Sequence, residues 1–452
     1  MTIPNSKKHI TAGSYSKQWF MASMIALAGT VAATTVKAQT NGSNSPYSRY
    51  GFGLLSDRAQ GFNKGMSGLA YGMRGGSELN TKNPASYSSI DSLSFIFDAG
   101  FSLQNANLEQ RGQKVNAHNS SYDYLSMGFR ASNNMGISIG IMPFSTIGYN
   151  ISQSETLKDN VEITQTNTYS GDGGLHEVYA GLGWKPLKFA SVGANIGYLW
   201  GDMTHTVLAS FSENTIASRR RQYTADVRTY KADFGLQFEG RLNTKNSFVI
   251  GLTYGLGHDI NSDSHYYDQK IENNTAIGDT LVATNAYQLP HTFGAGLTWM
   301  YAQKLRIGLD YTFQKWSDVK SPTLINTGNI GGQSYEARTG NFTDLHKITM
   351  GCEYIPNAEG LRRRDHIRYR AGFSYTTPYT LVNGTDGPKN FLVSVGVGLP
   401  IANIHNNRSI LNISAQYERV KPKAAGMITE NYLRLNIGLS FNERWFMKWK
   451  VE

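Results

Sequence analysis

The sequence has a single cysteine among its 452 residues, so it can form no internal disulfide and no cysteine-rich metal site. Charged residues are scarce at 17%, against roughly 25% in a typical globular protein. After residue 36, no stretch approaches the roughly 18 consecutive apolar residues of a membrane-spanning helix. These deficits exclude a disulfide scaffold and a bundle of membrane helices.

Motifs of common enzymes are also scarce. The sequence has no HExxH zinc motif and no Walker phosphate-binding loop, so we expect no catalytic residue, no metal ion and no cofactor. His258 and His265 share a segment with Asp259 and Asp263, which would suit a surface hydrolase or a metal site, but we interpret this segment as a solvated polar loop. The pI of 9.3 does not indicate nucleic acid binding in an exported protein.

Glycine and aromatic residues are abundant instead. The chain has 47 Gly, 26 Tyr, 20 Phe and 7 Trp, yet its mean hydropathy is only −0.38. These features occur together when side chains alternate between lipid and water, which is typical of a transmembrane β-barrel. The alternative is a soluble β-sandwich, in which half of each strand faces a core.

The first 38 residues have the features of a secretory signal peptide. Three lysines border an uncharged apolar stretch over residues 19–36, and small residues at Val36 and Ala38 predict cleavage before Gln39. The alternative is an uncleaved helical anchor. Because Gln39 is not cysteine, a lipoprotein is not indicated. We therefore expect export, with any membrane insertion taking place as strands.

Residues 39–91 differ from the rest of the chain, since they are rich in Gly, Ser, Asn and Tyr and show no two-residue rhythm. Phe52, Phe62 and Tyr87 favour a hatch packed inside a barrel over a loose periplasmic tail. Residues 92–441 alternate between apolar and polar side chains. We predict an all-β fold with fourteen antiparallel transmembrane strands, near residues 93–103, 124–131, 135–144, 175–184, 189–201, 231–241, 248–257, 292–301, 304–316, 345–355, 367–376, 391–399, 410–418 and 433–441.

The predicted connections alternate in length. Long ones, expected outside the cell, cover residues 105–118, 145–173, 202–224, 258–288, 317–342, 377–390 and 419–428. Most of the others are short, as periplasmic turns are. Both ends of the barrel sequence then lie at the periplasmic rim, and residues 442–452 form a periplasmic tail.

Several motifs resemble those of a known family. Asn83, Pro84 and Ala85 stand before the first strand, Pro143 and Phe144 end the third, and Leu289-Pro290-His291 opens the eighth. In order and spacing these resemble the long-chain fatty acid transporter (FadL-type) outer-membrane proteins, which have a fourteen-stranded barrel and an N-terminal hatch. An added segment at residues 44–51 and the aromatic, basic end of the chain resemble a branch from Bacteroidota-type bacteria.

The resemblance implies passive uptake of hydrophobic, fatty-acid-like molecules across the outer membrane, with a hatch as gate and a lateral exit beside the third strand. Pro143 and Phe144 are the candidate gap, because proline cannot donate a ladder hydrogen bond. A proline that merely ends a strand is the alternative. The same branch also implies a second role, as a non-transporting subunit of an outer-membrane protein assembly or secretion machine. Outer-membrane lipid is the expected surrounding.

Charged residues of both signs alternate onto the predicted inner face. The candidate lumen network consists of Arg130, Arg306, Arg368, Arg370 and Arg434 with Asp98, Asp310 and Glu353. It would either steer an anionic headgroup or hold the hatch, since buried charges must be paired. A run of three arginines, Arg362 to Arg364, lies in a predicted periplasmic turn, where it would contact acidic lipid, contact a partner or remain solvated.

Overall fold

The computed structural model describes residues 43–157, 163–213, 215–272, 275–326, 332–360, 362–401, 409–424 and 426–444. The predicted signal peptide and most of the predicted C-terminal tail lie outside these residues. Within them, no helix has both the length and the apolar character needed to cross a membrane.

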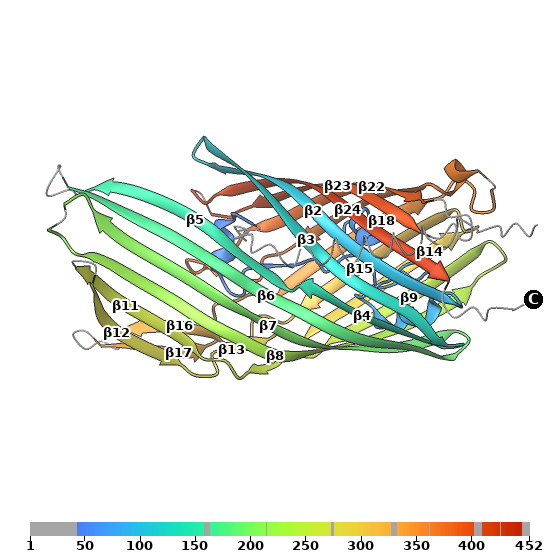
Figure 1. The fold of residues 1–452 in the computed structure, drawn as a ribbon, viewed down its shortest axis with the longest axis horizontal. Coiled ribbons are helices and arrows are strands. Elements are labelled where there is room, and N and C mark those ends of the chain that lie inside the picture. The colour runs from blue at the N-terminus through green and yellow to red at the C-terminus, as the bar shows by residue number, and fades with distance from the viewer. Residues whose placement is uncertain are drawn as a thin grey trace, which may run out of the picture. The chain divides into compact units, whose positions relative to one another are not determined.

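Strands close into a fourteen-stranded antiparallel barrel, which confirms the predicted fold class (Figure 1). The first strand of the wall pairs with both the second and the last, so the sheet has no end there. The third strand is divided in two, and the wall consists of β2 (Ser94–Gln110), β3 (Gln113–Ser132), β4 (Met135–Pro143) with β5 (Ser145–Thr156), β6 (Thr164–Leu187), β7 (Ala190–Phe211), β8 (Ser218–Arg241), β9 (Asn246–Gly255), β14 (Thr292–Tyr301), β15 (Leu305–Gln314), β18 (Leu345–Tyr354), β19 (Arg368–Thr376), β22 (Lys389–Pro400), β23 (Ile410–Lys421) and β24 (Thr429–Arg444).

Alternation along the strands separates an apolar outer face from a polar lumen. In β24, Leu433 and Leu435 are 57% and 42% exposed on the outside, whereas Asn436 and Ser440 are each 2% exposed inside. Successive side chains of a strand point to opposite faces, so a strict two-residue rhythm produces this division. The outer face therefore matches the hydrocarbon of a bilayer.

Several strands are far longer than a bilayer requires. β6 and β8 have 24 residues each, and β7 has 22. The prediction of long loops at residues 105–118, 145–173 and 202–224 was therefore wrong, because most of these residues continue the strands. Beyond the lipid both faces of a strand contact water, so the hydrophobic rhythm fades while backbone pairing continues.

We use inner rim for the end of the barrel at which β2 begins and β24 ends, and outer rim for the opposite end. Further strands extend the connections at the outer rim. β11 (Ser264–Glu272) pairs with β8 and with β12 (Thr275–Ala283). Small hairpins are formed by β10 (His258–Ile260) with β13 (Tyr287–Leu289), β16 (Ser321–Asn326) with β17 (Gln333–Arg338), and β20 (Leu381–Val382) with β21 (Thr385–Asp386).

Residues before β2 lie against the inner face of the wall. We use strap for residues 43–55, with η1 (Pro46–Arg49) and β1 (Leu54–Leu55), and plug for residues 56–93, with α2 (Gly61–Lys64) and η2 (Pro84–Ser89). Wall glycines allow close approach of the plug. A Cβ at Gly251 would lie 1.8 Å from the carbonyl oxygen of Tyr71, and one at Gly193 would lie 2.5 Å from the nitrogen of Ala85. Glycine is needed where two backbones meet this closely.

Candidate functional site

The Asn83-Pro84-Ala85 motif caps η2 and ties it to the wall. The Asn83 Oδ1 accepts a hydrogen bond from the nitrogen of Ala85 at 3.2 Å, and Pro84 occupies the first helical position. The Asn83 Nδ2 donates to the carbonyl oxygens of Tyr71 at 2.8 Å and of Leu236, in β8, at 3.3 Å. One amide side chain therefore joins two plug segments to the barrel.

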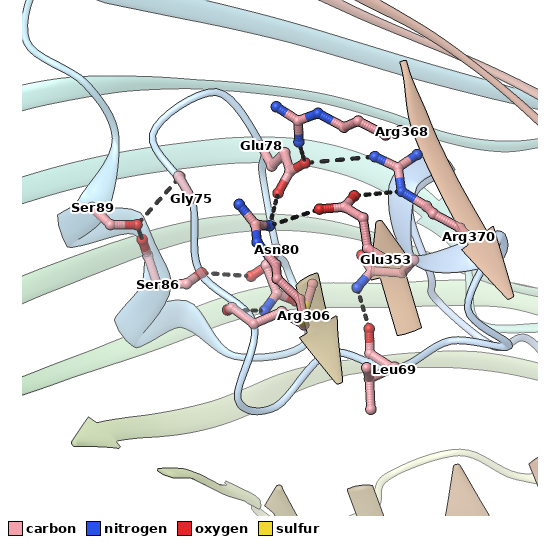
Figure 2. A network of polar contacts seen from close by, with 12 residues as sticks. Leu69, Gly75, Glu78, Asn80, Ser86, Ser89, Arg306, Glu353, Arg368 and Arg370 are labelled. Carbon is pink, nitrogen blue, oxygen red and sulfur yellow. Dashed lines mark hydrogen bonds and ion pairs between the residues drawn. The ribbon is translucent and has the colours of Figure 1, made fainter. Parts of the chain in front are cut away.

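Glu78 of the plug is the centre of a buried ion-pair network (Figure 2). Its carboxylate contacts Arg306 of β15 at 3.2 Å, Arg370 of β19 at 3.7 Å, and Arg368. Glu353 of β18 completes the network, at 2.7 Å from Arg370 and 3.4 Å from Arg306. The side chains of Glu353 and Arg370 are almost fully buried. Breaking such a pair leaves an uncompensated charge, which costs about 3–5 kcal/mol.

Other charged plug residues pair with different parts of the wall. Arg58 lies 3.1 Å from both Glu177 of β6 and Asp233 of β8. Lys64 lies 2.7 Å from Asp123 of β3. These contacts, together with those of Glu78, fasten the plug around the barrel rather than to one side.

Asp57 links the plug to the wall and also links two segments of the plug to each other. Its Oδ1 lies 2.6 Å from the Nζ of Lys347, in β18, and 3.3 Å from that of Lys82. Burial alone would raise the pKa of Asp57, but the two ammonium groups outweigh it and lower this pKa below its ordinary value. The carboxylate is therefore held in its charged form.

The structure distributes the candidate lumen residues over several places. Arg306, Arg368, Arg370 and Glu353 come together around Glu78. The Asp310 Oδ2 accepts from the backbone nitrogens of Ala70 at 2.6 Å and Tyr71 at 2.9 Å. The sequence rhythm could place these groups on the inner face, but only ring closure decides which of them meet.

Asp98, Arg434 and Arg130 lie apart from that network. Asp98 accepts from the hydroxyl of Tyr124 at 3.0 Å. Arg434 pairs with Glu418. Arg130 donates to backbone carbonyls near the inner rim, among them that of Ile90 at 3.2 Å. Sequence reasoning missed Glu78, Asp57 and Arg58; charged residues spread through a segment expected to lie inside the barrel were the signal that could have found them.

The wall is split where the third strand is broken. β3 pairs with β4 only from Leu125 to Ser132, and β4 ends at Pro143. Phe144 follows, with its nitrogen donating to the carbonyl oxygen of Leu175 at 2.7 Å. β5 then continues along β6, and no described wall strand pairs with its other edge. Figure 1 shows β3 and β5 diverging from this point.

The strap occupies this split. β1 pairs with β5, with Leu54 opposite Thr146 and Leu55 opposite Ser145. The Ser48 Oγ accepts from the nitrogen of Gly148 in β5 at 3.2 Å. Across the split, the Asn44 Nδ2 donates to the Oδ1 of Asn119 in β3 at 2.9 Å. The strap thus bridges two strands that do not pair with each other here.

An apolar cluster lies on the outer-rim side of the plug. Phe52 of the strap is fully buried at its centre, with ring centroids 5.6 Å from Tyr287 and 5.9 Å from Trp316. The cluster includes Phe342, from a connection at the outer rim, and extends to the partly buried Phe144. Apolar side chains are therefore continuous from the outer connections to the split.

A sequence motif that would suit an enzyme has a structural explanation. Gly136, Ser138 and Gly140 match the spacing of a hydrolase nucleophile motif, but Ser138 lies inside β4 and donates to the carbonyl oxygen of Met127 at 3.0 Å. In the described part of the chain, no group of three or more His, Cys, Asp or Glu side chains could hold a metal ion.

A closed fourteen-stranded barrel that encloses its own N-terminal segment defines a class of plugged barrels. Solved structures share this fold at low identity. The CymD monoaromatic hydrocarbon channel is 14% identical, with 88% of this chain and 100% of that chain covered and a TM-score of 0.56. The toluene transporter TbuX of Ralstonia pickettii is 12% identical, with 85% and 97% covered and a TM-score of 0.57. A FadL homologue of Pseudomonas aeruginosa is 12% identical, with 86% and 98% covered and a TM-score of 0.55.

The chain itself belongs to the BamG family, whose model matches residues 21–452. No curated protein matches it. The family assignment thus covers the whole described barrel, whereas the likeness to the channels concerns the fold.

Proposed function

We propose that the chain is a plugged outer-membrane barrel that serves as a non-transporting subunit of an outer-membrane protein assembly machine. Membership of the BamG family supports a link to the assembly machinery. The inner rim would then face the periplasm, and the outer rim the cell exterior.

One observation carries the proposal: the strap closes the split through which a ligand would leave sideways. Ser45 and Ser48 of the strap are fully buried, and β1 takes the edge of β5 beside the break. The plug contributes to the same result, because its ion pairs reach β3, β6, β8, β15, β18 and β19. A barrel closed in this way offers surfaces to partners rather than a path to ligands.

A second candidate is passive uptake of hydrophobic, fatty-acid-like molecules, gated by the strap and plug, with lateral exit at Pro143 and Phe144. The apolar cluster around Phe52 favours it, since it connects the outer rim with the split. The solved structures that share the fold include a monoaromatic hydrocarbon channel and a toluene transporter. Uptake would require the strap to leave the split.

A disulfide bond engineered between the strap and β5 distinguishes the two candidate functions. Leu54→Cys and Thr146→Cys, with Cys352→Ser, place two thiols on directly opposed residues. Opposed residues of antiparallel strands have Cα atoms about 4.5–5.5 Å apart, within the range that a disulfide bridges. We expect the oxidised variant to be recovered with the same partner proteins as the unmodified chain, and toluene or oleate uptake to be unaffected by the chain.

The matched controls are the two single-cysteine variants under the same oxidation. Uptake that depends on the chain and falls only when the double variant is oxidised would contradict the proposal and establish the second candidate. Recovery of the barrel alone, without any partner protein, would also contradict the proposal.

A further inference from the structure

One turn at the inner rim is longer than several others at that rim. β14 and β15 are joined by residues 302–304 and β8 and β9 by residues 242–245, whereas β18 and β19 are joined by residues 355–367. Internal hydrogen bonds stabilise the described part of this longer turn. The nitrogen of Asn357 donates to the carbonyl oxygen of Asp365 at 3.0 Å, and the His366 Nε2 donates to that of Gly360 at 2.6 Å. A short helix, η3 (Arg363–His366), forms its far side.

Three consecutive arginines project from this turn. Arg362, Arg363 and Arg364 are all exposed, and none of their side chains has a hydrogen bond or ion pair with another described residue. The arginines of the lumen network, by contrast, are bound to carboxylates. Guanidinium groups that bind no described residue of the chain are available to bind another molecule.

The acidic residues of the same turn do not neutralise the arginines. The carboxylate of Asp365 is turned back toward Gly360, where a Cβ would lie 2.4 Å from its Oδ2. Glu359 is exposed and forms no ion pair with a described residue. Lys304, whose carbonyl oxygen accepts from the nitrogen of Ile355 at 2.7 Å, adds a further exposed positive charge beside the turn.

The position of the turn favours a protein over the lipid surface as the occupant. Tyr354 and Tyr369 face each other across β18 and β19 and are 48% and 47% exposed on the outer face. Outward aromatic residues at strand ends mark the boundary of the bilayer, so the arginines lie beyond it on the water side. Successive residues of a 3₁₀-helix are spread by about a third of a turn, so the three side chains do not share one plane. A flat layer of lipid headgroups would contact only some of the three arginine side chains, whereas a peptide segment can bend to contact all of them.

We infer that Arg362, Arg363 and Arg364 form a docking site for an acidic, Asp- and Glu-rich segment of a periplasmic protein. The inference rests on the proposed function, since it names the chemistry by which a periplasmic subunit of the machine would hold this barrel. Arginine binds carboxylates through paired N–H groups, which provides both charge and geometry.

The first test uses the purified barrel in detergent and a fluorescent synthetic peptide rich in Asp and Glu. Fluorescence anisotropy should show saturable binding that weakens as salt is raised, because exposed charges are screened. Replacing all three arginines by glutamate should weaken binding by at least about tenfold, since opposed like charges repel. The matched control carries Arg111→Glu, Lys270→Glu and Arg338→Glu, which change the charge equally in the outer-rim connections and should bind as the unmodified chain does.

Three results would overturn the inference: equal binding by both triple variants, equal binding of a peptide with Asn and Gln in place of Asp and Glu, or preferential binding of phosphatidylglycerol vesicles through the same arginines. A milder variant with three Arg→Lys changes should restore part of the binding and excludes misfolding as the cause. Affinity purification from cells then separates the two proposals. No partner with the unmodified chain would refute the proposed function, whereas equal recovery of a partner by the Arg362–Arg364 variant would refute only the docking site.

Discussion

The strap and the plug lie in the same lumen but are held by different forces. The plug is fastened by ion pairs, such as that between Lys64 and Asp123. The strap is held mainly by neutral hydrogen bonds, by two residues of strand pairing and by Arg49, which lies 5.2 Å above the ring of Tyr169; the Ser45 Oγ also donates to the carboxylate of Glu430 in β24 at 2.7 Å. No ion pair between described residues involves the strap. Because a neutral hydrogen bond contributes only about 1 kcal/mol, we expect the strap to detach from the wall more readily than the plug.

The largest loss of stability should come from replacing Glu78, which lies at the centre of the ion-pair network. Glu78→Gln keeps the size of the side chain but leaves Arg306 and Arg368 without this carboxylate. We expect a loss of about 3–5 kcal/mol, as for other buried pairs with one partner removed. Urea unfolding of the detergent-solubilised barrel measures it. Glu359→Gln, on the exposed inner-rim turn, is the control, and equal midpoints for the two variants would show that the plug is not held by this network.

A backbone change should release the strap alone. Gly53 has a φ of +87°, and a Cβ there would lie 2.6 Å from the carbonyl oxygen of Thr146 in β5. Gly53→Ala therefore combines an unfavourable backbone conformation with a clash, and should cost about 1–3 kcal/mol. Hydrogen exchange in strap peptides should accelerate while exchange in plug peptides stays unchanged.

A glycine of similar conformation supplies the control for this change. Gly112 has a φ of +82° in the turn between β2 and β3, with nothing within 4 Å of its added Cβ. Gly112→Ala should leave strap exchange as it is in the unmodified chain. Equal acceleration in both variants would mean that the strap responds to general destabilisation rather than to the contact with β5.

The two regions also show what could be predicted from sequence. The alternation of Leu433, Leu435 and Ile437 was enough to predict β24, because each strand carries its own rhythm. The partners of Glu78 were not predictable, since Arg306 and Arg368 reach it only through closure of the barrel. The position of the strap could not be predicted for a similar reason. Its polar serines bind a strand edge that exists only because β4 ends at Pro143.

Acid should weaken the plug through Asp57. The pKa of Asp57 is lower in the folded chain than the roughly 3.9 of an unfolded aspartate. The contribution of Asp57 to the free energy of unfolding is therefore fully present above the unfolded pKa and is lost as pH falls through the folded pKa. Asp57→Asn removes this contribution at every pH. We expect a loss of about 1.5 kcal/mol at pH 7, at the lower end for charged hydrogen bonds because the side chain is 30% exposed.

Urea unfolding at a series of pH values measures this difference. The gap between the unmodified chain and Asp57→Asn should be constant from pH 7 to about pH 5 and should narrow below about pH 4. Asp279→Asn, in the exposed strand β12, should differ little from the unmodified chain at any pH. A gap that widens in acid would contradict the low pKa of Asp57.

The smallest effect should come from a single hydroxyl of the strap. Ser48 accepts from the nitrogen of Gly148 and donates to the carbonyl oxygen of Ser45 at 2.6 Å. Ser48→Ala should cost about 1 kcal/mol and speed hydrogen exchange of the strap roughly fivefold. Ser89→Ala removes a comparable hydroxyl bond, to the carbonyl oxygen of Ser86, from the plug and should leave the strap unchanged. If Ser48→Ala accelerated exchange in strap and plug together, the two regions would open as one unit and the difference between neutral and ionic attachment would have no consequence for opening.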